Sequence, residues 1–333
     1  MLDMSDNRKR VVVIGGGTGT SVVLNGLKES RLDLDLTAIV TVSDSGGSTG
    51  RLRDEFGFLP VGDLRQCLAA LASGKNQQLV RQLLLYRFSK GEGLSGHNLG
   101  NLILTALEDL AETPAQAIEQ ASRIFRVKGR VYPITQENVQ LVIEYESGLK
   151  VMGEHFLDDA KTGGQRILKI SLMPSASIYA KSAQAIKEAD LVVLGPGDLY
   201  ASLLPNTLVD GFFSAISECQ GEFVYVVNLM THYAQTDQMT AADHFKEVER
   251  YAKRKPDVVI MNSGQISPAI LQKYAKAHEY PVVDDLDLID ANQVMRLDLV
   301  TQIEVVQDTA DSVTRSLLRH NHLRLAAALT DLL

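Results

Sequence analysis

The fold is decided by the stretch Val11-Val12-Val13-Ile14-Gly15-Gly16-Gly17-Thr18-Gly19 near the start of the chain. Its first four residues form a short, continuous apolar run, which is typical of a strand buried on both faces of a parallel sheet. Glycines follow at once, and a helix is predicted to begin near Thr18. Strand, glycine turn and helix together predict the first unit of an α/β, doubly wound, Rossmann-like fold with a mostly parallel sheet.

The glycine turn does not match the dinucleotide fingerprint G-x-G-x-x-G. Counted from Gly15 the last position is Thr20, and counted from Gly17 it is Val22. The mismatch argues against NAD or FAD, which makes an NAD-dependent oxidoreductase the weakest functional alternative. Helix-to-strand packing alone would also explain such a turn. We nevertheless predict ligand contact at Gly16, Gly17, Thr18 and Gly19.

A second predicted strand, residues 36–42, leads into a polar stretch at residues 43–53. Glycine lets backbone N–H groups turn toward an anion, hydroxyls add donors, and arginines bind phosphate in a bidentate manner. A flexible polar surface loop is the alternative explanation. Asp44 is a candidate for a ribose or sugar hydroxyl, or for Mg²⁺. The predicted ligand-binding residues of this stretch are Asp44, Ser45, Gly46, Gly47, Ser48, Arg51 and Arg53.

A predicted amphipathic helix carries Asp63 and Arg65 in its first turn. An acidic residue suits a helix N-terminus, whereas a cation there opposes the helix dipole, so we expect Arg65 to share an anion with the polar stretch. Helices are also predicted at residues 77–88 and 99–110, separated by a glycine-rich patch. That patch supplies three candidates: His97 as a general base or a positioning residue, Asn98 as a ligand contact or an N-cap, and Asn101.

The hydrophobic period changes from helical to alternating between residues 120 and 171. Antiparallel strands are predicted at residues 140–145, 149–155 and 166–172. We expect a β-rich insertion at about residues 127–172 that covers one edge of the site or makes an oligomer contact. The α/β domain is expected to span residues 9–333, after a poorly ordered extension at residues 1–8.

Three later predicted strands each end in a polar or glycine-rich turn: residues 191–194, 223–227 and 258–261. Because the carboxyl ends of parallel strands meet at one edge of a sheet, these turns are expected to build a composite site with the first glycine turn. A further βα unit is predicted from Val282, with closing helices at about residues 312–318 and 323–333. The candidate residues from these turns are Gly195, Gly197, Asp198, Tyr200, Asn228 and Thr231.

The composition is that of an ordinary globular protein. The 333 residues are 45% hydrophobic and 22% charged, with a net charge of −8 that repels polyanions and argues against nucleic acid as a partner. Two cysteines, Cys67 and Cys219, indicate neither a disulfide framework nor a zinc site. No run approaches the ~20 apolar residues of a membrane span, so a cytoplasmic protein is expected.

Taken in order, these motifs resemble those of the YvcK-type gluconeogenesis factors, which are similar in fold to the transferase CofD. The resemblance rests on the glycine turn at residues 15–19, the polar stretch at residues 44–53, Gly62-Asp63-Leu64-Arg65, Gly96-His97-Asn98-Leu99-Gly100-Asn101, Tyr132-Pro133-Ile134-Thr135, Gly153-Glu154, Gly195-Pro196-Gly197-Asp198-Leu199-Tyr200 and Asn228-Leu229-Met230-Thr231.

The resemblance implies a regulator needed for cell shape and for growth on gluconeogenic carbon sources. It implies binding of UDP-sugars such as UDP-N-acetylglucosamine and a site contribution from Arg319. A protein partner in cell-wall regulation and a homodimer are separate expectations, and the sequence itself does not give the oligomeric state. In this interpretation the arginines hold the diphosphate, while Asp44, Asp198 and Asn228 orient the sugar and the base.

A CofD-like transferase is the alternative. It would move a phospholactyl-type group from a nucleoside diphosphate donor to a deazaflavin, with Mg²⁺ held at Asp44 and Asp63. The 6% aromatic content and the lack of tryptophan weaken this alternative, because nothing specifies a pocket for a bulky aromatic acceptor.

Overall fold

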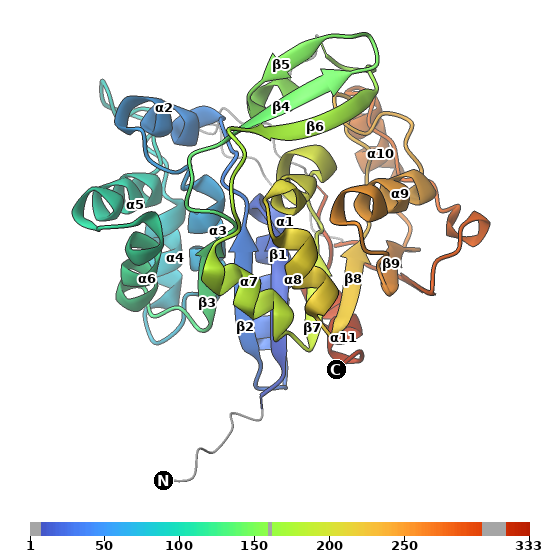
Figure 1. Cartoon of the computed structure of the whole chain (residues 1–333), viewed down its shortest axis with the longest axis horizontal. Coiled ribbons are helices and arrows are strands. Elements are labelled where there is room, and N and C mark those ends of the chain that lie inside the picture. Colours follow the sequence, from blue (N-terminus) through green and yellow to red (C-terminus); the bar gives the residue numbers. More distant parts are fainter. Residues whose placement is uncertain (1–7, 159–161, 302–317) are drawn as a thin grey trace.

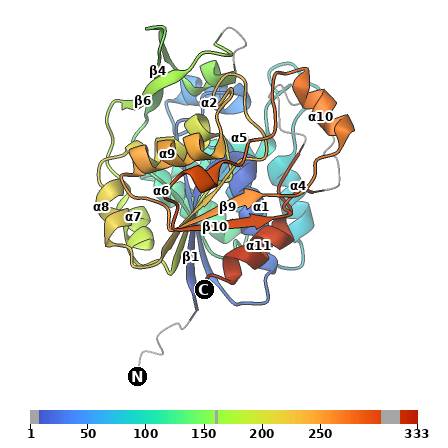
Figure 2. The same ribbon diagram turned by 90° about the vertical axis from the view of Figure 1, so that its right-hand side faces the viewer.

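The computed structural model describes residues 8–158, 162–301 and 318–333. Two predictions therefore lie outside the described residues: the N-terminal extension, apart from Arg8, and most of the helix at residues 312–318. The described chain contains a large parallel sheet with helices on both faces and a small antiparallel sheet (Figures 1 and 2).

The large sheet has seven strands, and every neighbouring pair is parallel. The chain builds β1, β2 and β3 outward in one direction and β7 to β10 in the other. The strand order therefore reverses between β1 and β7, which confirms the doubly wound α/β prediction. In spatial order the strands are β10 (Gln293–Leu297), β9 (Val258–Asn262), β8 (Glu222–Val226), β7 (Leu191–Leu194), β1 (Arg10–Gly15), β2 (Asp35–Val40) and β3 (Arg130–Pro133).

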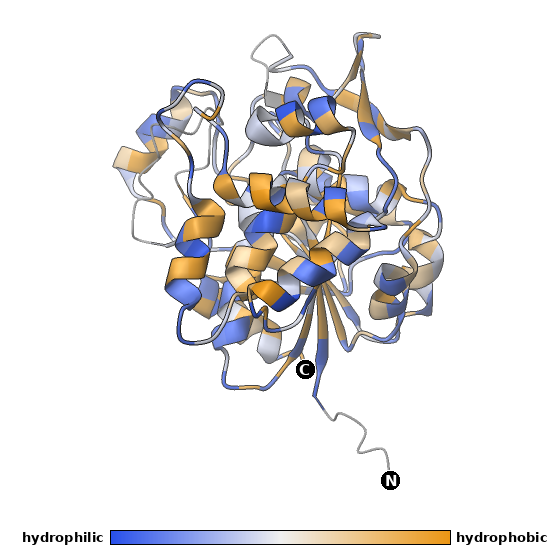
Figure 3. Cartoon of the chain, turned by 90° about the vertical axis from the view of Figure 1, so that its left-hand side faces the viewer, coloured by the Kyte–Doolittle hydropathy of each residue, from blue (hydrophilic) through white to orange (hydrophobic). Residues whose placement is uncertain are grey.

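The two faces of the sheet build separate cores, because successive side chains of a strand point to opposite faces. In β1, Val11 and Val13 belong to one core and Val12 and Ile14 to the other. Figure 3 shows the strands largely apolar between helices of mixed character. The first face is covered by α1 (Gly17–Glu29), α3 (Gly62–Leu71), α4 (Gln77–Leu85), α5 (Leu99–Leu110), α6 (Pro114–Ile124) and α11 (His322–Thr330), and the second by α7 (Ala180–Lys187), α8 (Phe212–Glu218) and α9 (Ala241–Ala252).

The antiparallel sheet lies above the carboxyl ends of the parallel strands (Figure 1). Its order is β5 (Lys150–Met152), β4 (Gln140–Tyr145) and β6 (Ile167–Met173). The insertion begins later than the expected residue 127, because β3 pairs with β2 in the large sheet. The predicted strand at residues 149–155 is also too long, since Glu154–Asp158 forms the 3₁₀ helix η1.

Two further predictions need correction. The polar stretch is not a loop throughout, because Gly47–Phe56 forms helix α2, which ends at Gly57 in the left-handed conformation. Val282 starts no strand: its N–H bonds to the carbonyl of Leu229, and the edge strand is β10. Only two valines follow Pro281, which is too short a run for a strand, whereas β10 is half-exposed and lacks the apolar run of a central strand.

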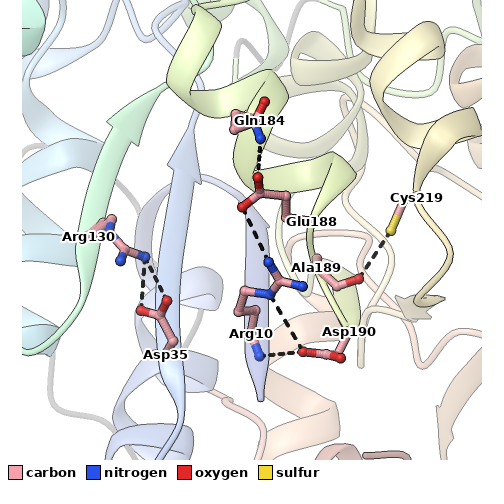
Figure 4. A network of polar contacts seen from close by, with 8 residues as sticks. All are labelled: Arg10, Asp35, Arg130, Gln184, Glu188, Ala189, Asp190 and Cys219. Carbon is pink, nitrogen blue, oxygen red and sulfur yellow. Dashed lines mark hydrogen bonds and ion pairs between the residues drawn. The ribbon is translucent and has the colours of Figure 1, made fainter. Parts of the chain in front are cut away.

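Polar contacts hold the amino ends of the strands together (Figure 4). Asp35 of β2 accepts two bonds of 2.9 Å from Nη1 of Arg130 on β3. The N–H of Arg10 donates to Asp190 (2.7 Å), just before β7, and its side chain pairs with Glu188 (3.3 Å). These contacts fix β1, β2, β3 and β7 relative to one another at the edge opposite the loops.

Candidate functional site

A cavity of about 480 Å³ lies at the carboxyl ends of the strands, at the switch point between β1 and β7. This is the position at which open α/β sheets bind ligands, and the volume is in the range of small-molecule sites. The walls come from the turn after β1, the residues after β2, the start of α3, the loops after β7 and β8, and helix α10 (Pro268–Ala275).

In the turn after β1, other segments of the chain lie too close to Gly16 and Gly19 to leave room for a side chain. A Cβ on Gly16 would lie 2.2 Å from Oδ2 of Asp63, and one on Gly19 would lie 2.0 Å from the carbonyl oxygen of Pro196. Gly17 has a φ of +64°, which favours glycine. The turn therefore brings the N-terminus of α1 directly to the cavity, where backbone N–H groups can bind an anion.

Asp44 forms the wall that follows β2. Its Oδ1 accepts the N–H of Gly46 (2.8 Å), and its other oxygen is 2.8 Å from where a Cβ on Gly62 would lie. Burial raises the pKa of Asp44, while the bonds from Gly46 and Thr49 and the nearby Arg53 and Arg65 oppose that rise. The carboxylate is thus preorganised by donors on one side and faces the cavity on the other.

Arg65 is a buried cation in the first turn of α3. Its Nε donates to Oδ1 of Asn101 (2.7 Å), and its Nη1 donates to the carbonyl of Leu84 (3.1 Å). These two bonds fix the orientation of the guanidinium. Arg65 and Asn101 both line the cavity. The cation at a helix N-terminus thus joins α3, α4 and α5, a structural task beside any contact with an anion.

Ser48 is the centre of a second polar group. Its Oγ lies 3.2 Å from Nδ1 of His97 and accepts the N–H of Asn98 (3.2 Å) and Nδ2 of Asn101 (3.3 Å). Asn98 also caps α5 by accepting the N–H of Asn101. Burial, followed by the charge of Arg51, lowers the pKa of His97, so the ring is neutral at pH 7 and suited to positioning Ser48.

The opposite wall comes from the loops after β7 and β8. The N–H of Gly197 donates to Oδ1 of Asn228 (3.3 Å), which ties the two loops together. Thr231 exchanges two bonds with Tyr280, of 2.7 Å from its N–H and 3.0 Å to its hydroxyl. The buried His320 donates from Nε2 to the carbonyl of Val227 (3.2 Å), and burial lowers its pKa to about 4. A neutral His320 therefore anchors the segment that carries Arg319 to the end of β8.

Comparison with known proteins identifies the family. The family model described as "2-phospho-L-lactate transferase CofD" matches residues 11–302. The chain belongs to the CofD family. A protein named gluconeogenesis factor from Bacillus subtilis is 37% identical over 328 residues, which cover 98% of each chain. A putative gluconeogenesis factor from Aquifex aeolicus is 42% identical over 84% of this chain and 85% of the relative.

A solved structure supports the same assignment for this CofD-family chain. A Bacillus halodurans protein of the UPF0052 family superposes with a TM-score of 0.87 at 36% identity, covering 97% of this chain and 99% of that one. At this identity and coverage the likeness extends to the whole α/β fold, including the antiparallel element.

The structure brings most of the predicted site residues of this CofD-family chain to the cavity. They come from seven separate segments that meet at the carboxyl edge of the sheet, which is the composite arrangement expected of parallel strands. The lining includes Gly16, Gly17, Thr18, Gly19, Asp44, Gly46, Gly47, Ser48, Asp63, Arg65, Asn101, Gly197, Asp198, Asn228, Thr231 and Arg319.

Seven predicted residues do not line the cavity: Ser45, Arg51, Arg53, His97, Asn98, Gly195 and Tyr200. The stretch at residues 47–56 is helical; on it Arg51 is exposed with its guanidinium beside Gly96, and Arg53 pairs with Asp54 (2.9 Å). Ser45 instead contacts His155 (3.1 Å), and the hydroxyl of Tyr200 donates to Glu247 (3.0 Å). His97 and Asn98 act one layer behind the cavity, through Ser48, and Gly195 lies just before the lining residue Pro196.

Sequence reasoning missed several lining residues, among them Gln66, Arg87, Glu154, Lys273 and Glu279. Glu154 belongs to one of the family motifs, so a signal for it was present in the sequence. Lys273 lies on α10, which the sequence did not predict, and its neighbourhood carries no glycine-rich turn. Only the packing of α10 beside the loop after β8 brings that cation to the site.

The carboxylates at this CofD-family site suit a metal only together with a ligand. Among the described residues, no group of three or more His, Cys, Asp or Glu side chains could hold a metal ion. Asp44 and Asp63 both line the cavity, and Mg²⁺ is commonly held by one or two carboxylates plus substrate phosphates. Within residues 8–158, 162–301 and 318–333, no helix has the length and apolar character needed to cross a membrane.

Proposed function

We propose that this CofD-family chain is a regulatory protein that binds a UDP-sugar, with UDP-N-acetylglucosamine as the ligand. The observation that carries the proposal is the composite cavity at the switch point, where two glycine turns and four cationic side chains converge. The cations are Arg65, Arg87, Lys273 and Arg319. The same lining holds the carboxylates of Asp44, Asp63, Glu154, Asp198 and Glu279. The cations and the backbone N–H groups of the turns therefore favour an anionic group on the ligand, while the carboxylates favour neutral hydroxyl groups.

The two ends of such a ligand need different partners, and the cavity offers both. Backbone N–H groups at the turns and guanidinium groups suit a diphosphate. Carboxylate and amide oxygens of Asp44, Asp198 and Asn228 suit the hydroxyls of ribose and sugar and the polar edge of a base. The broken dinucleotide fingerprint disfavours NAD at the same position.

The regulatory role is supported by the relatives named gluconeogenesis factors. The proposal includes control of cell shape and of growth on gluconeogenic carbon sources, with a cytoplasmic location, a protein partner in cell-wall regulation and a homodimer. Its support is the resemblance to that branch of the family.

Titration calorimetry tests the ligand. UDP-N-acetylglucosamine is expected to bind, while GDP and NAD bind more weakly, each measured with Mg²⁺ and with a chelator. If no uridine nucleotide sugar releases or takes up heat and none shifts the melting temperature, the proposed function is wrong.

A charge variant on α10 tests the cavity wall. Lys273→Ala is expected to weaken binding of UDP-N-acetylglucosamine roughly fivefold, equivalent to about 1 kcal/mol for a solvated charge contact. Lys276→Ala is the matched control, because it removes the same charge from an exposed position beside α10 that does not line the cavity. Equal affinities of the two variants would remove α10 from the site.

A Mg²⁺-dependent transferase is the second candidate, and the match to the CofD family model favours it. Asp44 and Asp63 would hold the metal, and positioning with charge neutralisation would supply most of the catalysis. A turnover assay with a guanosine-linked phospholactate donor, a deazaflavin acceptor and Mg²⁺ decides the question. Product formation would establish the transferase, and its absence under saturating substrates would leave the regulator.

A further inference from the structure

The antiparallel element reaches the cavity through the 3₁₀ helix η1. The N–H of Gly153, just before η1, donates to the carbonyl of Leu141 on β4 (2.8 Å). The N–H of His155 donates to Oγ of Ser45 (3.0 Å), and Leu157 is fully buried in the core. Three contacts on different sides thus hold η1 firmly over the residues that follow β2.

This attachment places Glu154 in the cavity wall beside Asp44. A Cβ on Gly46 would lie 3.5 Å from Oδ1 of Asp44 and 4.0 Å from Oε2 of Glu154, so the two carboxylates lie next to Gly46, each with an oxygen within 4.0 Å of that position. Asp44 comes from the parallel sheet and Glu154 from the insertion. Two elements that are separate in the fold therefore supply one carboxylate-lined end of the cavity.

Two carboxylates repel a phosphate but accept bonds from hydroxyl groups. The diphosphate is accordingly expected away from this end, toward the opposite wall, where the turns after β7 and β8 and the cations Lys273 and Arg319 line the cavity. A neutral, hydroxyl-rich group fits the carboxylate end, and in a nucleotide sugar that group is the sugar.

We infer that Glu154 is a specificity-determining residue that binds hydroxyl groups of the sugar, and that the antiparallel element thereby selects sugar-bearing nucleotides over the bare nucleoside diphosphate. This inference rests on the proposed function. It assigns to the insertion a role in ligand selection, one of the two roles that the sequence left open.

The test compares two ligands that differ only in the sugar, UDP-N-acetylglucosamine and UDP, by titration calorimetry on the full chain. Glu154→Gln keeps the size of the side chain and removes its charge. The variant is expected to bind UDP-N-acetylglucosamine about tenfold more weakly, the scale of a bond to a charged group. UDP is expected to bind equally well or more tightly, because its terminal phosphate no longer meets a carboxylate.

Glu146→Gln is the matched control, since it removes an exposed charge from the same element away from the cavity and is expected to change neither affinity. The titrations are repeated with a chelator, and the effect of Glu154→Gln is expected to persist without Mg²⁺.

Four results would overturn the inference. Equal weakening of both ligands would show a structural role, and no change would show that Glu154 does not meet the sugar. An effect that disappears with the chelator would make Glu154 a metal contact. If the wild-type chain bound neither ligand, the proposed function itself would fail, an outcome distinct from the other three.

Discussion

At the scale of single residues, three arginines in and near the polar stretch have different roles. Arg51 is exposed, and the buried Arg53 pairs with Asp54 and donates to the carbonyl of Asp44, whereas Arg65 lines the cavity from α3. Any guanidinium group can bind phosphate, but its position on a helix decides whether it reaches a phosphate in the cavity. Arg51→Ala is therefore a surface variant, while Arg65→Ala would leave Asn101 and the Leu84 carbonyl without their donor.

The buried residue His244, which contacts Tyr225, makes the free energy of unfolding depend on pH. His244 on α9 is fully buried, and its Nδ1 lies 3.1 Å from the hydroxyl of Tyr225. Burial lowers the pKa of His244 to about 4, from an ordinary value of 6.5. The unfolded chain thus binds a proton in a pH range where the folded chain does not, and stability is lost as pH falls from about 6.5 toward 4.

We expect His244→Leu to flatten this dependence. Between pH 7 and pH 5 the wild-type free energy of unfolding should fall by about 2 kcal/mol more than that of the variant, since one pKa unit is worth 1.36 kcal/mol. Urea unfolding at the two pH values measures the difference. The prediction is contradicted if the free energies of unfolding of the two proteins change equally with pH. The variant keeps some pH dependence, because the buried His320 also has a pKa of about 4.

At the scale of elements, α1 and the loop after β7 form the floor of the cavity by direct backbone contact. Gly19 in the first turn of α1 packs on Pro196, and Gly26 further along packs on the carbonyl of His322, the first residue of α11. Glycine in a helix normally costs stability, so its presence here reflects close approach of neighbouring segments.

Gly19→Ala should lower the free energy of unfolding by about 1–3 kcal/mol, the cost of overpacking, and should also weaken ligand binding because the two turns must separate. Gly57→Ala is the control: it has a φ of +75° with nothing within 4 Å of the new Cβ, so it costs only about 1 kcal/mol of backbone strain and spares binding. Denaturant unfolding and calorimetry on both variants measure these effects. A Gly19→Ala protein with unchanged affinity would show that this contact does not shape the cavity.

At the scale of the whole molecule, the two edges of the parallel sheet have separate tasks. The amino edge carries ion pairs such as Asp35 with Arg130, while the carboxyl edge carries the cavity. The strands of the large sheet lie between the two edges, so a change at one edge reaches the other only through the core.

Asp35→Asn should therefore separate stability from binding. The partly exposed pair is expected to contribute about 1 kcal/mol or less to the free energy of unfolding. Affinity for UDP-N-acetylglucosamine should stay within twofold of wild type. A larger loss of affinity, measured by calorimetry on the folded variant, would show coupling across the sheet.

The sequence by itself determined the parallel α/β fold, the glycine turn, the three strands of the insertion and the edge at which a ligand would sit. These follow from local patterns, because apolar runs, periodicity and glycine act within a few residues of one another. It did not predict β10, because this edge strand is half-exposed and lacks the apolar run of a central one.

Only the tertiary structure decided which side chains of that edge meet in the cavity. Arg51 and Arg53, on the helix at residues 47–56, do not line the cavity, whereas the packing of α10 and η1 brought in Lys273 and Glu154. The physical reason is that these contacts between side chains depend on the packing of segments more than a hundred residues apart, such as those of Ser45 and His155, and no local pattern encodes that packing. The carboxylate end of the cavity, where the insertion meets the parallel sheet, exists only in the folded chain.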